Sequence, residues 1–195
     1  MPSIGIFFAS ETGNTAEIAR LIQQRHLPAG AAEVRDLEVT DAAQIAAYDR
    51  LIFGTSTMGC GEYPAALEAF LPELDDIDFR GKTVALFGLG DQYGYPGEFC
   101  DALGLLYQEL LRRSAHLVGF WPTAGYAYEA SQADLGDGSF CGLVLDEDNQ
   151  PELTGQRLSA WIEEIRGDLL PNGPAVPLRQ QAPGRAVAAG RTRAA

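Results

Sequence analysis

The chain has 195 residues, so a single domain is the first expectation, and its 46% hydrophobic content is enough for a buried core. The chain has 14 basic and 27 acidic residues, which gives a formal charge of −13. This excess of negative charge argues against binding to nucleic acids and to anionic lipids. All the acidic residues lie before position 169, whereas four arginines follow it. Residues 1–170 therefore carry −17 and the last 25 residues carry +4.

Five short apolar runs follow one another along the chain, each long enough for a strand and too short for a helix. They are Ile4–Phe8, the weaker residues 33–36, and residues 50–54, 83–88 and 116–121. Their apolar residues are continuous rather than alternating, which is typical of parallel strands buried on both faces.

Helical spacing of apolar residues fills most of the intervals between these runs. The expected helices begin at Asn14, with Glu17 three residues on, and continue with residues 41–48, 65–74, 99–113 and 154–165. Alternating strands and helices predict an α/β fold in which a parallel sheet has helices on both faces.

Two segments depart from this alternation. Residues 122–153 are rich in turn formers and acidic residues, with one apolar piece at residues 140–145. Residues 171–195 consist largely of Pro, Gly, Ala and Arg, and they have too few large apolar side chains to offset the entropy lost on ordering. We therefore expect a domain over residues 1–170 and a disordered tail over residues 171–195.

No targeting or metal-binding signal is evident. No apolar run approaches the roughly 20 residues that a membrane-spanning helix needs, and the first residues do not have the basic and apolar segments of a signal peptide. The three cysteines and two histidines are isolated, without metal-ligand spacing. We expect a cytoplasmic protein with reduced thiols, no membrane contact and no metal.

The loop after the first strand, Ser10-Glu-Thr-Gly-Asn-Thr15, stands directly before a helix. Three hydroxyls, a glycine and a helix N-terminus can bind a phosphate group. The loop has no lysine, so it is neither the GxxxxGK[ST] loop of nucleotide hydrolases nor a GxGxxG loop. Taken alone, a plain turn that caps a helix explains these residues equally well.

The loops after the third and fourth strands are also unusual. Residues 54–64 and 88–97 are rich in glycine and contain Met58, Tyr93 and Tyr95, which are suited to covering a planar ring. The carboxyl ends of parallel strands lie at one edge of a sheet, where ligands bind. Together, the three loops predict a site for a planar cofactor that carries a phosphate.

These segments, in this order, closely resemble the flavodoxins, FMN-carrying electron shuttles, over roughly residues 3–170. Ser10–Thr15 resembles the family's phosphate loop, residues 55–59 and 88–95 its two flavin-flanking loops, and residues 140–149 the segment that follows the extra loop of long-chain members. The resemblance implies a flavodoxin-like three-layer sandwich. Its five-stranded parallel sheet has the order 2-1-3-4-5, with the last strand split by an insertion.

The resemblance also implies residue roles in binding FMN. Ser10, Glu11, Thr12, Gly13, Asn14 and Thr15 are expected to hold the phosphate, and Thr55, Ser56 and Thr57 to line the ribityl chain and the ring entrance. Tyr95 is expected to stack on the outer ring face, with Gly90, Asp91 and Gln92 at the pyrimidine edge. The cofactor-binding set also includes Met58, Gly59, Gly88, Leu89 and Phe99, with Asp101 and Asp146 near the rim and the ribityl chain.

One position departs from the family pattern, because Met58 stands where many members place Trp on the inner flavin face. A thioether still packs well against an aromatic ring. The resemblance implies that the Met58–Gly59 peptide turns to accept a hydrogen bond from the flavin N5–H, and glycine permits that turn. It further implies a low-potential one-electron carrier, not an enzyme, that cycles between semiquinone and hydroquinone, because the acidic surroundings disfavour the anionic hydroquinone.

The expected partners are redox proteins with basic docking faces. Two acidic groups suggest where they dock: residues 62–78 near one flavin loop, and Glu129, Asp134, Asp137 and residues 146–148. The resemblance implies a pyridine-nucleotide-dependent flavodoxin reductase as donor and nitrogenase reductase or a similar acceptor, with the carrier acting as a monomer. The sequence does not choose among these partners.

Three alternative functions share the topology. An FMN-dependent quinone or azo reductase needs an open pocket beside the flavin, against which Tyr95 and the short loop after the third strand argue. A scaffold module with an empty site is opposed by the intact loops. A phosphoacceptor response regulator needs acidic residues after the first strand and a lysine after the fifth, and Ala9, Ser10 and Trp121 do not supply them.

Overall fold

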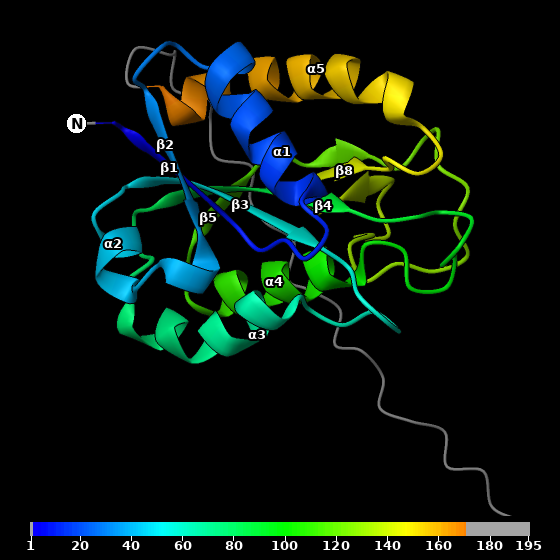
Figure 1. Cartoon of the computed structure of the whole chain (residues 1–195), viewed down its shortest axis with the longest axis horizontal. Helices are drawn as coiled ribbons and strands as arrows, with labels where there is room; N and C mark the ends of the chain where they lie inside the picture. Colours follow the sequence, from blue (N-terminus) through cyan, green and yellow to red (C-terminus); the bar gives the residue numbers. More distant parts are fainter. Residues whose placement is uncertain (1, 171–195) are drawn as a thin grey trace, which may run out of the picture.

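The chain is described by a computed structural model over residues 2–170, so the disorder expected for residues 171–195 falls outside the described residues. A central parallel sheet runs through the molecule (Figure 1). Its strands are β1 (Ile4–Phe8), β2 (Ala32–Asp36), β3 (Arg50–Ser56), β4 (Thr83–Leu89), β5 (His116–Val118) and β8 (Leu143–Leu145). The strand order β2-β1-β3-β4-β5 confirms the expected 2-1-3-4-5 topology.

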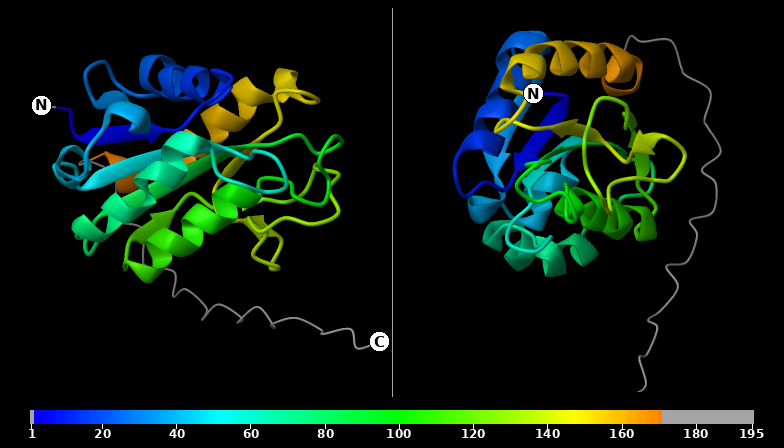
Figure 2. Two further views of the ribbon diagram at one scale, coloured as in Figure 1. Left: turned by 60° about the horizontal axis from the view of Figure 1, so that its bottom comes forward. Right: turned by 90° about the vertical axis from the view of Figure 1, so that its right-hand side faces the viewer.

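Helices cover both faces of the sheet, giving three layers (Figure 2). One face carries α1 (Asn14–Leu21) and α5 (Pro151–Leu169), and the other carries α2 (Ala42–Ala46), α3 (Ala65–Phe70) and α4 (Asp101–Arg112). Successive strand residues point to opposite faces. Ile6 accordingly packs with Ile18 and Trp161, whereas Phe7 packs with residues of the α3 and α4 layer.

The last strand of the sheet is split, as the resemblance implied. β5 pairs with the first half of β4, at Thr83 to Ala85, and β8 pairs with the second half, at Phe87 to Leu89. The insertion between them contains a small antiparallel pair, β6 (Trp121–Pro122) with β7 (Ser139–Phe140). The two halves of the strand therefore lie end to end along β4.

The fifth strand ends earlier than the apolar run over residues 116–121 predicts. Gly119 has a φ of 79°, and the indole N–H of Trp161 donates a hydrogen bond to its carbonyl at 2.8 Å. A Cβ at this position would lie 2.6 Å from that indole nitrogen. The close approach of α5 thus turns the chain out of the sheet, and Trp121 joins the insertion instead.

Helix boundaries also differ from the predicted ones. The pattern over residues 65–74 becomes the short α3 followed by a 3₁₀ segment, Leu71–Asp76, because Pro72 has no N–H for an α-helical hydrogen bond. α4 begins at Asp101 rather than at residue 99, since Cys100 has a φ of 56°. α5 begins with Pro151, a favoured first helical residue, and not at Thr154.

Within residues 2–170, no helix combines the length and the apolar character needed to cross a bilayer. The same residues contain no group of three or more His, Cys, Asp or Glu side chains that could hold a metal ion.

Candidate functional site

A cavity of about 350 Å³ opens at the carboxyl end of the sheet, where the loops after β1, β3 and β4 meet the segment after β8. Ligands of open parallel sheets bind beyond these strand ends. Eleven residues chosen from the sequence line this cavity: Thr12, Asn14, Ser56, Thr57, Met58, Gly59, Leu89, Gly90, Asp91, Tyr95 and Phe99. The fold therefore gathers three loops that are far apart in the sequence around one space.

The loop after β1 leaves the first turn of α1 open to a ligand. Gly13 precedes the helix with a φ of 95°, and no side chain caps it. The Ser10 hydroxyl accepts a hydrogen bond from the Gly13 N–H at 3.0 Å, which fixes the curl of the loop. Thr12 and Asn14 line the cavity, while Thr15 is buried behind them. The N–H groups of a first helical turn lack partners within the helix, so they suit an anion.

The side chain of Glu11 contacts another loop of the site. Its carboxylate accepts a hydrogen bond from the Ala65 N–H at the start of α3, at 3.1 Å. The side chain therefore ties the loop after β1 to the segment after β3. Any contribution of Glu11 to an anion site has to come from its backbone, since a carboxylate repels a phosphate.

The loop after β3 is a tight turn built on Met58. Its N–H donates to the Glu62 carbonyl at 2.9 Å, and its carbonyl accepts from the Gly61 and Glu62 N–H groups at 3.1 and 2.7 Å. Gly59 lies between them with a φ of 50°, and a Cβ there would lie 2.3 Å from a Glu62 carboxylate oxygen. The backbone angle at position 59 favours glycine, and a Cβ there would force the Glu62 carboxylate to move.

The hydroxyl residues of this loop divide into two groups. Thr57 lines the cavity, and its hydroxyl also accepts a hydrogen bond from the Ala102 N–H at 3.2 Å, which joins the loop to α4. Ser56 lines the cavity too, with its hydroxyl 3.8 Å from the Met58 sulfur. Thr55 is fully buried and is not among the lining residues, so its expected contact with the ligand stays a prediction.

The loop after β4 is shaped by Asp91. One of its carboxylate oxygens accepts hydrogen bonds from the N–H groups of Tyr93 and Gly94, at 3.1 and 2.7 Å. The Gly94 N–H is the main reason that the pKa of Asp91 is lowered. A Cβ at Gly94 would lie 2.1 Å from the carboxylate, so a larger residue there would displace the Asp91 side chain. Tyr95 follows at the rim with 57% of its surface exposed, and its flat ring is available to a ligand.

The inner wall of the cavity is formed by Phe99 and Cys100, which precede α4. Phe99 is fully buried and stacks on Tyr128 of the insertion, with ring centroids 5.5 Å apart. Burial raises the pKa of the Cys100 thiol well above its usual range, so this thiol stays protonated. The wall is therefore apolar and closely packed, which suits a planar ring.

Four predicted residues have structural tasks outside the cavity lining. Asp101 accepts a hydrogen bond at 2.7 Å from the Gln132 N–H of the insertion, and Asp146 is fully buried beneath the loop after β4. Gln92 is buried and is not a lining residue, and its side-chain amide donates a hydrogen bond to Asp146. Gly88 lets α4 pack closely, since a Cβ there would lie 2.9 Å from Leu103. None of the four is among the lining residues, and their contact with a flavin stays a prediction.

Four further residues line the cavity without having been chosen from the sequence: Glu98, Cys100, Glu147 and Asp148. The acidic run after β8 was recognised, but only its first member was assigned to the site. Burial, followed by the nearby carboxylates Asp91 and Asp146, raises the pKa of Asp148. No Lys or Arg is among the lining residues, so the only charged side chains that line the cavity are carboxylates.

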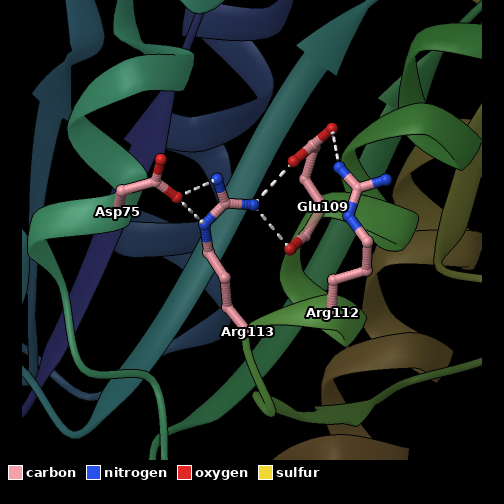
Figure 3. A network of polar contacts seen from close by, with 4 residues as sticks. All are labelled: Asp75, Glu109, Arg112 and Arg113. Atoms are coloured by element: carbon pink, nitrogen blue, oxygen red, sulfur yellow. Dashed lines mark hydrogen bonds and ion pairs between the residues drawn. The ribbon is translucent and has the colours of Figure 1, made fainter.

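The acidic groups expected to dock partners are only partly free. In the group at residues 62–78, Asp75 pairs with Arg113 at 2.5 Å, and Arg113 also pairs with Glu109, which holds Arg112 (Figure 3). Asp78 pairs with Arg80 in the same region, and this hydrogen bond lowers its pKa to about 2. In the second group, which includes residues 146–148, Asp146 is fully buried and cannot contact a partner.

Comparison with known proteins gives one consistent family. The family model described as flavodoxin matches residues 6–161. Flavodoxin 1 of Escherichia coli is 46% identical over 169 residues, covering 87% of this chain and 96% of that protein, and the flavodoxin of a Picosynechococcus is 44% identical over 166 residues, covering 85% and 97%. A crystal structure of Fusobacterium nucleatum flavodoxin bound to flavin mononucleotide superposes with a TM-score of 0.78 at 35% identity, covering 87% and 99%. The chain belongs to the flavodoxin family.

Proposed function

We propose that this protein is an electron carrier that binds FMN non-covalently in the cavity at the carboxyl end of its sheet. The observation that carries the proposal is the composition of that cavity. An uncapped helix N-terminus with the hydroxyl of Thr12 occupies one part, and Met58, Tyr95 and Phe99 line another. A ligand that fits both parts has an anionic group and a flat apolar ring.

The phosphate of FMN is bound by the chain without a cation. The N–H groups of the first turn of α1 and the hydroxyls of the loop after β1 supply hydrogen bonds, and the helix dipole favours the negative charge. Ser10 and Gly13 hold this loop in shape before any ligand is present. Binding therefore costs little reorganisation at this end of the site.

The loops after β3 and β4 would hold the ring of FMN, with Met58 and Tyr95 as the residues that cover it. FMN supplies the redox chemistry, and the chain supplies binding, orientation and electrostatics. The Met58 carbonyl is held by the N–H groups of Gly61 and Glu62, so any turn of this peptide exchanges those two hydrogen bonds for one to the ring. The glycine at position 59 permits the turn.

The carrier works between the semiquinone and hydroquinone forms of its cofactor. Support comes from the carboxylates of Asp91, Glu98, Glu147 and Asp148 around the cavity and from the absence of any basic lining residue. An added negative charge is poorly stabilised in such surroundings, which makes the second electron strongly reducing. No lining residue is a histidine or a nucleophile in an activated state, and the Cys100 thiol is kept protonated by burial.

The partners in this proposal are redox proteins with basic docking faces, a flavodoxin reductase as donor and a nitrogenase reductase or similar acceptor, which the carrier meets as a monomer in the cytoplasm. The exposed ring of Tyr95 lines the cavity together with its carboxylates. Long-range charge attraction would steer a basic partner to this cavity. Association rates should then fall steeply with added salt, and flat salt dependence would contradict the docking model.

The test is a titration of the apoprotein with FMN and with riboflavin, which lacks the phosphate, followed by stepwise anaerobic reduction with visible spectra. We expect one FMN per chain and a one-electron form that accumulates midway. Thr12→Val removes one hydroxyl from the phosphate loop, so it should weaken FMN binding by about tenfold and leave riboflavin binding unchanged. Thr83→Val, at the opposite end of β4, is the matched control and should change neither.

A flavin-dependent quinone or azo reductase on the same fold is the alternative. It predicts direct two-electron reduction of bound FMN and rapid turnover of a small quinone with a nicotinamide donor. Failure of the apoprotein to bind FMN would refute both functions.

A further inference from the structure

The side chain of Asp146 is a fully buried carboxylate at the end of β8. No ion pair found within residues 2–170 includes it. A buried carboxylate is costly unless hydrogen bonds replace its water. Its presence therefore raises the question of what its hydrogen bonds hold in place.

Five nitrogen donors surround this carboxylate. One oxygen accepts from the backbone N–H of Gln92 at 3.1 Å and from its side-chain amide at 2.7 Å. The other accepts from the backbone N–H groups of Asp148 and Asn149, at 3.2 and 2.9 Å. The Asn149 side-chain amide lies 3.0 Å from both oxygens. Because all five nitrogens donate hydrogen bonds, the side chain at position 146 has to be one that only accepts them, as a carboxylate does.

Asn149 carries the connection to the cavity. Its side-chain amide also donates to a carboxylate oxygen of Asp91, at 2.7 Å. That same oxygen accepts from the N–H groups of Tyr93 and Gly94, and the Asp91 carbonyl accepts from the Tyr95 N–H at 3.0 Å. The turn that presents Tyr95 to the cavity is therefore linked to Asp146 through one amide.

Gln92 carries a second connection, to the insertion. The carbonyl oxygen of its side chain accepts a hydrogen bond from the Ala127 N–H at 2.6 Å, while its amide nitrogen is held by Asp146. Gln92 is 1% exposed, so these bonds are shielded from water. The ring-covering loop, the end of β8 and the insertion thus meet at one buried carboxylate.

We propose that Asp146 is a positioning residue, which shapes the loop from Gly90 to Tyr95 for the flavin ring before the ligand arrives. The inference rests on the proposed function only in naming FMN as the ligand. Asp146 does not line the cavity, and it acts through Gln92 and Asn149. A loop held in its bound shape loses less entropy on binding, so removing the hold weakens affinity for the ring.

Asp146→Asn is the main test, because it keeps the size of the side chain and places an N–H₂ group among donors. Asp41→Asn is the matched control: Asp41 also accepts backbone hydrogen bonds, capping α2, and Asn caps helices equally well. Two quantities are measured. One is hydrogen exchange of the Tyr93, Gly94 and Tyr95 amides in the apoprotein, and the other is the Kd for FMN and for riboflavin.

We expect Asp146→Asn to speed exchange of those three amides while amides of β1 keep their protection. It should raise the Kd for FMN and for riboflavin by a similar factor, about tenfold, because only the ring end of the site is disturbed. The visible bands of bound FMN should shift as well, since the ring surroundings change. Asp41→Asn should match the wild type in every readout.

Unchanged exchange at these amides, or a loss confined to FMN with riboflavin unaffected, would overturn the proposal. If Asp146→Asn does not fold, Asn149→Ala takes its place, since it cuts the link to Asp91 and leaves the bonds between Asp146 and Gln92. It should speed exchange at Tyr93 and Gly94. The exchange measurement needs no flavin, so wild-type protein that failed to bind FMN would refute the proposed function and leave the positioning role to be decided by exchange.

Discussion

A single methyl group added at Gly90 would test how closely the wall of the cavity is packed. A Cβ at this position would lie 2.7 Å from the Cys100 sulfur, 3.0 Å from a ring carbon of Phe99 and 3.1 Å from the Cys100 backbone nitrogen. Gly90 cannot easily move away, because its N–H donates to the Leu145 carbonyl at 3.1 Å. The Gly90→Ala substitution should therefore displace Phe99 and Cys100, which form the inner wall of the cavity.

The magnitude follows from the packing. Overpacking of a buried site by one methyl group costs about 1–3 kcal/mol. The sulfur makes the shortest of the three contacts, so Cys100→Ala should relieve much of that cost, and the coupling between the two substitutions should be about 1 kcal/mol or more. The contacts with Phe99 and the backbone remain, and the rescue should be partial.

Urea denaturation of the apoprotein measures these free energies of unfolding for the wild type, both single variants and the double variant. Titration of the same four proteins with FMN measures the effect on the cavity, where we expect Gly90→Ala to weaken binding and the double variant to recover part of it. If Gly90→Ala lowers the free energy of unfolding by the same amount with Cys100 and with Cys100→Ala, the sulfur is not the limiting contact and the packing argument fails.

Three further predictions concern the site and the insertion. Hydrogen bonds lower the pKa of Asp91, so their stabilisation is fully present above its ordinary value near 4 and is lost as the pH falls below it; FMN affinity measured against pH should weaken in that range, and a gain there would contradict the argument. Tyr126→Phe leaves the Trp121 indole N–H and the Val144 carbonyl without their shared hydroxyl, and urea unfolding should show a loss of about 1–3 kcal/mol. Gly104→Ala places a Cβ 2.2 Å from backbone atoms of the insertion, so limited proteolysis should cut the insertion faster, and unchanged cleavage would refute the contact.

The candidate site was predictable where local sequence carries local structure. A turn-rich loop directly before an amphipathic helix marks a helix N-terminus, whatever the rest of the chain does. Glycine-rich loops after strands 50–54 and 83–88 could be assigned to one sheet edge from the α/β alternation alone, and Thr12, Met58 and Tyr95 do line one cavity. Such inferences need only the order of the elements.

Side-chain direction within the loops was not predictable. Gln92 lies between lining residues in the sequence, yet it is buried and its side chain bonds to Asp146 and Ala127, which are 54 and 35 residues away along the chain. Glu11 likewise reaches Ala65 rather than the cavity, across 54 residues. A local sequence pattern cannot predict these hydrogen-bond partners, since they belong to distant segments of the chain.

The sequence by itself determined the fold class and the three loops of the site, because periodicity and turn chemistry act over a few residues. The strand order was expected only from the resemblance to the flavodoxins. Tertiary structure alone decided where β5 ends, which acidic residues are buried or paired, and which loop residues face the cavity. These outcomes depend on contacts between distant segments, such as the indole of Trp161 against Gly119 and the carboxylate of Asp146 beneath Gln92. Burial makes such contacts strong enough to override the local preference of each segment.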